Sequence, residues 1–190
     1  EEDLLKLAGV SEAAQTDSVF KSVRARAPWL LVNLGTAIVA SWVISNFEGS
    51  IDRLIALAVL MPIVASMGGN AGTQSVTVAV RAIATRYLDA GNSHSFVLRE
   101  TMVGFLNGVA LGALMGIGTY LWFHDAYLTL VMVIAAITTL TMAGFWGALI
   151  PILIHRFRGD PAISSSIFLT TITDCVGFFS FLGLATLILL

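Results

Sequence analysis

Five apolar stretches, each long enough to cross a lipid bilayer, constrain this chain more than any other feature of its sequence. They cover residues 27–47, 51–79, 96–123, 126–154 and 162–190. A helix needs about 20 predominantly apolar residues to span a membrane. The stretches lack the period-two alternation of an outer-membrane barrel strand. The sequence therefore predicts an all-α membrane protein whose residues 27–190 form a domain of five transmembrane helices.

The composition excludes several other classes of protein. Of the 190 residues, 57% are hydrophobic and 12% are charged, and the mean hydropathy is +0.88. Soluble domains carry about 25% charged residues, so a disordered chain and most soluble enzymes are excluded. A net charge of −2 provides no basic face for a nucleic acid. The single cysteine, Cys175, excludes a disulfide framework and a CxxC motif.

The positions of the basic residues predict how the chain is oriented in the membrane. Only Arg53 lies on one side, in the loop after the first stretch. The other nine lie before the first stretch or around the loops after the second and fourth: Lys6, Lys21, Arg24, Arg26, Arg81, Arg86, Arg99, Arg156 and Arg158. Since Lys and Arg accumulate in cytoplasmic loops, we expect the N-terminus in the cytoplasm and the C-terminus outside.

Residues 1–26 are polar and mildly amphipathic, and we expect a short cytoplasmic helix that lies on or enters the membrane. Pro28 and Pro161 are assigned to the first turns of the first and fifth helices, where a missing N–H is tolerated. The chain begins with Glu1 rather than Met, so we expect further domains to precede it in the full protein.

Asp174 is the sharpest candidate for chemistry. It lies about 18 Å along the fifth stretch, close to the middle of the bilayer, whereas every other acidic residue falls in the N-terminal tail or near a loop. A charged side chain at this depth costs about 2.5–3.5 kcal/mol on insertion scales, so it usually faces water or a partner. No Lys, Arg or His lies in the interior of the other stretches to pair with it, since Arg53 and Arg99 lie within a few residues of the ends of theirs. An ion site is the favoured interpretation, and a protonated Asp bonded to a neighbouring helix is the alternative.

Polar and small residues extend from Asp174 along one side of the fifth helix. With about 100° per residue, one arc of roughly 120° holds Ser166, Thr170, Thr173, Asp174, Gly177 and Ser180. Ser and Thr often bond other helices in membranes. A continuous stripe centred on an acid, however, favours the wall of a conduit.

The second stretch offers a matching wall. An arc of roughly 100° holds Ser66, Gly69, Asn70, Thr73 and Thr77. Pro62 removes one helical hydrogen bond, and the pair at residues 68–69 leaves the backbone bare, which membranes tolerate only inside protein or along a water-filled cavity. We expect Gly69 to offer a carbonyl oxygen and Asn70 its amide to a passing cation.

The third stretch carries Gly104, Gly108, Gly112 and Gly116 at four-residue spacing. Such a row lets another helix approach closely. It is interpreted as packing that holds the fold, with a moving interface as the alternative.

These motifs resemble the transmembrane domain of the MgtE family of magnesium channels. The resemblance covers nearly the whole chain and rests on P-x5-GGNAGTQ at 62–74, ATRYLD at 84–89 and GDPAISSSIFLTTITDCVGF at 159–178. It implies a bacterial or archaeal plasma-membrane protein that forms a homodimer. The cation pore would lie between the subunits, lined by the second and fifth helices.

The resemblance also implies roles for particular residues. Asp174 is the central pore ligand, and the nearby pore positions are Thr170, Ser166, Gly69, Asn70 and Thr73. The family often has Asn where this chain has Ser166 and Thr73. Glu2 and Asp3 resemble an acidic pair that joins a regulatory magnesium site with cytosolic CBS modules, which we expect in the full protein. The transported ion is Mg²⁺, with Mn²⁺ and other divalent cations as further candidates.

Two other functions are weighed against a channel. A secondary divalent-cation transporter coupled to Na⁺ or H⁺ would also use a mid-membrane acid, but the sequence shows no inverted repeat and no second buried titratable group. An intramembrane aspartyl protease would need two carboxylates at one site, and no GxGD-type motif is present. We therefore expect no enzymatic activity.

Overall fold

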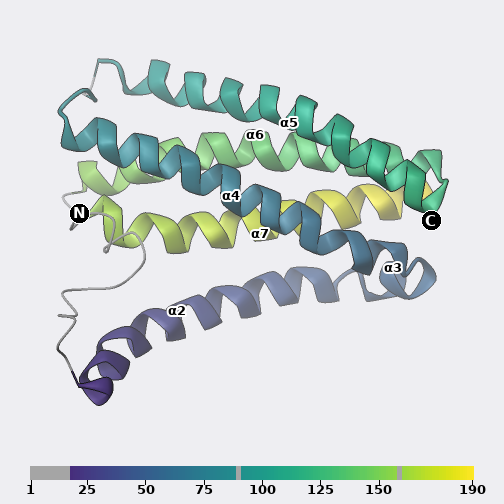
Figure 1. Ribbon diagram of the computed structural model, residues 1–190, viewed down its shortest axis with the longest axis horizontal. Helices are drawn as coiled ribbons and strands as arrows, with labels where there is room; N and C mark the ends of the chain where they lie inside the picture. The colour runs from purple at the N-terminus through teal and green to yellow at the C-terminus, as the bar shows by residue number, and fades with distance from the viewer. Residues whose placement is uncertain (1–17, 89–90, 158–159) are drawn as a thin grey trace.

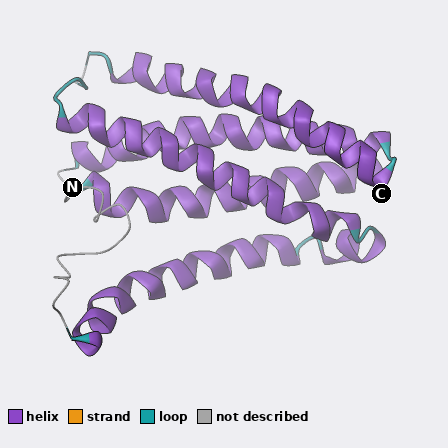
Figure 2. Cartoon of the chain, in the orientation of Figure 1, coloured by secondary structure: helices purple, strands orange, loops and turns teal. Residues whose placement is uncertain are grey.

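The chain folds into a bundle of long helices (Figure 1). The computed structural model describes residues 18–88, 91–157 and 160–190, without the side chains of 161–164. The long helices in these ranges are α2 (Val19–Ser45), α4 (Ala56–Ala84), α5 (Ser93–Phe123), α6 (Ala126–Arg156) and α7 (Pro161–Leu189), and a short α3 (Glu48–Arg53) follows α2. The described residues contain no strand (Figure 2). All five long helices contain segments long and apolar enough to cross a membrane, which confirms the predicted fold class.

Helix α6 lies at the centre of the bundle and packs against α4, α5 and α7. One of the buried clusters joins three of these helices through Leu57 and Leu60 of α4, Met132 of α6, and Phe181 and Leu182 of α7. These side chains are at most 2% exposed. The apolar contacts of α6 therefore hold α4 and α7 beside each other.

The contact between α5 and α6 is built on the four glycines at positions 104, 108, 112 and 116, all of which are buried. A Cβ atom added to Gly108 would lie 2.9 Å from the Cα of Ile137, so the two backbones touch. One added to Gly112 would lie 3.2 Å from the carbonyl oxygen of Val133. Small residues at such a contact allow close packing of membrane helices. The structure thus agrees with the packing interpretation of this row.

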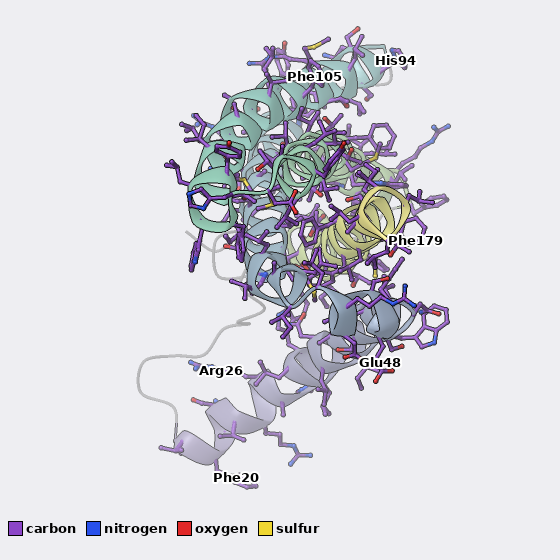
Figure 3. The ribbon with its side chains drawn as sticks, turned by 90° about the vertical axis from the view of Figure 1, so that its right-hand side faces the viewer. Phe20, Arg26, Glu48, His94, Phe105 and Phe179 are labelled. Carbon is purple, nitrogen blue, oxygen red and sulfur yellow. The ribbon has the colours of Figure 1, made fainter. Side chains whose placement is uncertain are left out.

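Helix α2 begins earlier than the sequence predicted. It starts at Val19 and continues without a break into the span expected from residue 27. Pro28 lies inside this helix, so the assignment of Pro28 to a first turn was wrong. A proline there leaves the carbonyl of Arg24 without its helical partner, and Arg24 is exposed, so other polar groups can reach that carbonyl. At this end α2 stands clear of the other helices, with Phe20 at its outer end (Figure 3).

The second predicted span, 51–79, is interrupted near its start. Residues 51–53 belong to α3, and Leu54 leaves the helical conformation with φ −136° and ψ 88° before α4 begins. The Ser50 and Thr186 hydroxyl oxygens lie 2.8 Å apart, which ties α3 to α7. The remaining limits shift by a few residues: α4 ends at Ala84, α5 begins at Ser93 and α6 ends at Arg156, whereas Pro161 does open α7 as expected.

Candidate ion site between α4 and α7

Helices α4 and α7 run in opposite directions and cross at small residues. A Cβ atom on Gly68 would lie 3.6 Å from the Cβ of Thr173, and one on Gly72 would meet the side chain of Leu169. One turn away in the other direction, a Cβ on Gly177 would lie 3.5 Å from Cγ1 of Val64. The contacts therefore advance along α4 as they retreat along α7, and they fix the antiparallel register of the two helices.

This register sets the levels of the candidate ion ligands. Gly69 follows Gly68 and Asp174 follows Thr173, but in antiparallel helices these two steps go in opposite directions, so Gly69 and Asp174 differ in height by about 3 Å. One helical turn further along α4, four residues on, Thr73 likewise lies within about 3 Å of the height of Thr170 on α7. The two ligands in each of these pairs thus differ in height by less than one helical turn.

The polar face of α4 points away from the rest of the chain. Ser66, Asn70, Thr73 and Thr77 are exposed, and Gly69 is half-buried. The Oγ1 atoms of Thr73 and Thr77 each donate a 2.8 Å hydrogen bond to the carbonyl four residues earlier. A hydroxyl whose proton is used in this way still offers oxygen lone pairs. This face therefore presents a row of acceptor oxygens outside the single-chain core.

Helix α7 contributes Asp174, which is half-buried, and Thr170, which is exposed. Ser166 is half-buried, and its carbonyl accepts a 2.9 Å hydrogen bond from Oγ1 of Thr170. These three residues repeat every four positions along α7. Carboxylate and hydroxyl oxygens are ligands that suit Mg²⁺ and its bound water.

The predicted stripe on α7 is not one continuous wall. Thr173 and Gly177 are buried in the packing against α4 and α6, and the Thr173 hydroxyl bonds the carbonyls of Leu169 and Thr170 at 3.0 and 3.2 Å. Ser180 is similarly engaged, since its hydroxyl donates to the Gly177 carbonyl at 3.2 Å. An arc of about 120° was too wide because its buried edge serves helix packing.

The backbone at residues 68–69 is also more regular than expected. Helix α4 continues through both glycines and through Pro62. Gly68 is used for the close approach to Thr139 of α6 and Thr173 of α7, while a Cβ on Gly69 would meet no atom within 4 Å. The Gly69 carbonyl accepts the Thr73 hydroxyl at 2.8 Å. What Gly69 offers is therefore a carbonyl of a regular helix beside open space, without a break in the helix.

One buried acid was not expected from the sequence. Glu100 was grouped with the residues near loops, yet it lies two turns inside α5 and is only 6% exposed. Its Oε2 accepts a 3.1 Å hydrogen bond from the hydroxyl of Ser75 on α4. The statement that the chain has no second buried titratable group was therefore wrong. Its position well inside the third apolar helix, beside the glycine row, was the available signal.

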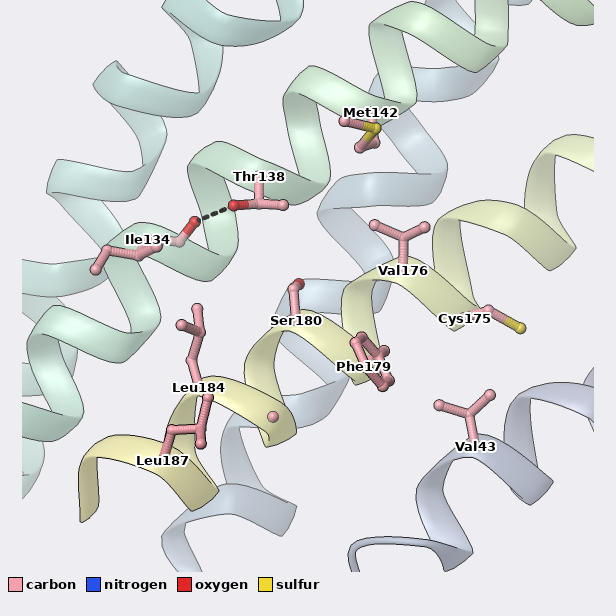
Figure 4. A pocket seen from close by; sticks show the side chains of 11 residues that line it. Val43, Ile134, Thr138, Met142, Cys175, Val176, Phe179, Ser180, Leu184 and Leu187 are labelled. Atoms are coloured by element: carbon pink, nitrogen blue, oxygen red, sulfur yellow. Dashed lines mark hydrogen bonds between the residues drawn. The ribbon is translucent and has the colours of Figure 1, made fainter.

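A large apolar groove of about 720 Å³ lies on another side of α7, against α2 and α6 (Figure 4). Its polar side chains are already engaged: the Thr138 hydroxyl donates 2.9 Å to the Ile134 carbonyl, and Ser180 is bonded as described above. Cys175 lines this groove beside Phe179. An ion needs oxygen ligands, so this groove is unsuited to conduct one.

The described residues contain no cluster of three His, Cys, Asp or Glu side chains that could hold an ion. Asp174 therefore stands as one carboxylate among hydroxyl, amide and carbonyl oxygens. Glu2 and Asp3, the expected regulatory pair, lie outside the described residues.

Comparison with known proteins finds one matching family and several curated relatives. The MgtE family, described as divalent cation transporters, matches residues 61–184. The chain is similar to the magnesium transporters MgtE of Enterococcus faecalis (31% identical over 185 residues), Bacillus subtilis (30% over 187) and Thermus thermophilus (34% over 165). These matches cover 97%, 98% and 87% of this chain but 41%, 42% and 36% of the relatives. The chain thus spans about two fifths of the length of these curated relatives.

Proposed function

The chain belongs to the MgtE family of divalent cation transporters, and from that premise we propose that it conducts hydrated Mg²⁺ through a pore at the interface of a homodimer. It is an integral membrane protein of a non-enzyme class. The resemblance that the sequence showed to this family is confirmed. A bacterial or archaeal plasma membrane and a cytoplasmic N-terminus remain part of the proposal.

One observation carries the proposal: an exposed row of polar groups on α4 lies level with a half-buried carboxylate on α7, inside helices that span the membrane. Polar groups facing lipid would be costly and would leave Asn70 without partners. A second copy placed against this face removes the exposure to lipid. It also encloses a path lined by oxygen atoms from both subunits.

The dimer would bring two Asp174 carboxylates to opposite sides of one axis. At a separation of about 8 Å and an effective dielectric constant of about 20, they repel each other by about 2 kcal/mol. A divalent ion about 4 Å from each carboxylate attracts either one by about 8 kcal/mol. A monovalent ion gains half as much, so the arrangement favours divalent cations before dehydration is counted.

The remaining residues suit the water around the ion. Mg²⁺ gives up its water reluctantly, and Thr170, Ser166, Gly69, Asn70 and Thr73 supply groups that can bond that water. The pore can then select the ion by its hydrated size and its charge without removing its bound water. The same oxygen ligands suit Mn²⁺ and other divalent cations. Cytosolic CBS modules, with Glu2 and Asp3 at a shared regulatory magnesium site, would control closure of the pore.

The test replaces Asp174 with Asn in the full-length protein and measures Mg²⁺ flux into proteoliposomes. We expect flux to fall at least about 100-fold, because the Asn amide keeps the shape of the side chain and removes the charge that attracts the ion. Asp52→Asn, at an exposed site on α3, is the matched control. Chemical crosslinking should show the same dimer in all three proteins, and normal flux through a dimeric Asp174→Asn protein would refute the assignment.

The buried Glu100 favours a second candidate, a divalent-cation carrier coupled to Na⁺ or H⁺, because coupled carriers use intramembrane acids. The two functions differ in what drives flux. A channel carries Mg²⁺ down its own gradient with no sodium and no pH difference across the vesicle. Flux that stops when both are removed would replace the channel by the carrier.

A further inference from the structure

A groove between α5 and α6 lies at the end of the bundle where α5 begins and α6 ends. Its volume is about 510 Å³. The walls are mainly apolar, with Val97 on α5 and Phe145 and Leu149 on α6. Its outer end holds His94 and Arg156, and both of these side chains are exposed. His94 lies on the side of the bundle remote from α2 (Figure 3). The groove thus combines an apolar trough with a polar, cationic mouth.

The length of the groove matches one leaflet of a membrane. Its lining extends along α6 from Phe145 to Arg156, which corresponds to about 16 Å at 1.5 Å per residue. One leaflet contributes about half of the roughly 30 Å hydrocarbon core. An acyl chain lying in the trough would therefore end near the level of the membrane surface, at the cationic mouth.

The charge at this end favours an anion at the mouth. Exposed Arg81 and Arg99 lie near the adjoining ends of α4 and α5, and exposed Arg86 lies in the turn that follows α4. Glu100 is buried and bonded to Ser75, so it does not offset them at the surface. The positive-inside pattern predicts this end to be cytoplasmic, and basic pockets between helices on that side suit anionic headgroups.

We propose that this groove binds an anionic phospholipid, with one acyl chain in the trough and the phosphate at Arg156 and His94. The apolar walls favour a lipid over a soluble phosphate, which would leave the trough unfilled. The positive charge disfavours a second copy, because like ends of two chains would repel each other at the mouth. The site uses α5 and α6 and shares no residue with the polar face of α4, so it stands apart from the ion path.

The test is native mass spectrometry of the full-length protein in detergent, titrated with palmitoyl-oleoyl phosphatidylglycerol or with the zwitterionic phosphatidylcholine of the same chains. We expect phosphatidylglycerol adducts to exceed phosphatidylcholine adducts at least fivefold. The double variant Arg156→Gln and His94→Gln should remove that preference. Arg53→Gln, an exposed arginine of α3 at the other end of the bundle, should keep it. Equal binding of both lipids, or a preference unchanged in the double variant, would overturn the proposal.

A steric variant tests the trough separately. Leu149→Trp should lower adducts of both lipids at least threefold while thermal unfolding confirms that the protein is folded. If Leu149→Trp unfolds the protein, the variant Leu98→Trp is used instead, because Leu98 is an exposed residue of the groove lining. Phospholipids with bromine-labelled acyl chains should then quench the fluorescence of this tryptophan. Displacement of phosphatidylglycerol by soluble glycerol phosphate would contradict a lipid site. The proposal would also be contradicted if Leu149→Trp dissociated the dimer without changing lipid binding.

Discussion

Two helix contacts in this bundle both use glycine to bring helices close together, but the side chains around the two contacts differ. The α5–α6 contact places Gly108 against the backbone of Ile137, and the α4–α7 contact places Gly68 against Thr173. Around the first contact the outward side chains of α5 are large and apolar, such as Leu106 and Leu114. Beside the second lie Asn70 and Asp174. Close approach of the helices holds the fold together at the α5–α6 contact. At the α4–α7 contact it also sets the positions of polar groups along the bundle.

The largest expected effect comes from breaking the α5–α6 contact. Gly108→Val would place its Cβ 2.9 Å from the Cα of Ile137, so the two backbones must separate. Overpacking of this kind costs about 1–3 kcal/mol or more. We expect a large fall in the thermal unfolding temperature in detergent, with flux lost along with the fold. A Cβ added to Gly118 on the same helix meets no atom within 4 Å, so Gly118→Val is the matched control. Equal losses in both variants would show that the α5–α6 contact does not cause the effect.

The exposed α4–α7 face should respond in the opposite way. Thr73→Val combined with Thr170→Val keeps the side-chain shape and removes two outward hydroxyl oxygens. We expect Mg²⁺ flux to fall about tenfold while the free energy of unfolding changes by less than about 0.5 kcal/mol, as for exposed sites. Thr119→Val removes a buried hydroxyl that bonds the Met115 carbonyl within α5, and its flux should stay normal. A large loss of stability without loss of flux in the double variant would assign this face to packing.

The α5–α6 contact could be predicted from the sequence more fully than the α4–α7 contact. The glycine row of α5 and the five spans are local patterns, so length and spacing were sufficient to identify them. The division of the α7 stripe was not visible, because whether Thr173 or Thr170 is buried depends on where α4 and α6 cross it. The break at Leu54 and the burial of Glu100 likewise depend on neighbouring helices. Spacing finds the faces of a helix, and tertiary packing decides which face is exposed.

Glu100 links the two contacts, because it reaches from α5 to Ser75 of α4. Glu100→Gln keeps an oxygen that can accept the Ser75 hydroxyl, so we expect flux within about twofold of normal and little change in stability. Glu100→Ala leaves that hydroxyl without its partner, and such losses cost about 1–3 kcal/mol. Thermal unfolding and proteoliposome flux of both variants separate these effects. A collapse of flux in a stable Glu100→Gln protein would place this carboxylate in the transport cycle and favour the coupled carrier.

The smallest expected effect is at Gly69, where the comparison with Gly68 is sharpest. Gly69→Ala adds a methyl group with no atom within 4 Å, whereas the same change at Gly68 would place Cβ 2.6 Å from Cγ2 of Thr139. Alanine favours a helix over glycine by about 1 kcal/mol, so Gly69→Ala should unfold at the same temperature or slightly higher. Gly68→Ala should unfold lower. The opposite order would mean that Gly69, and not Gly68, sets the distance between α4 and its neighbours, and the heights assigned to Asp174 and Thr73 would then no longer follow.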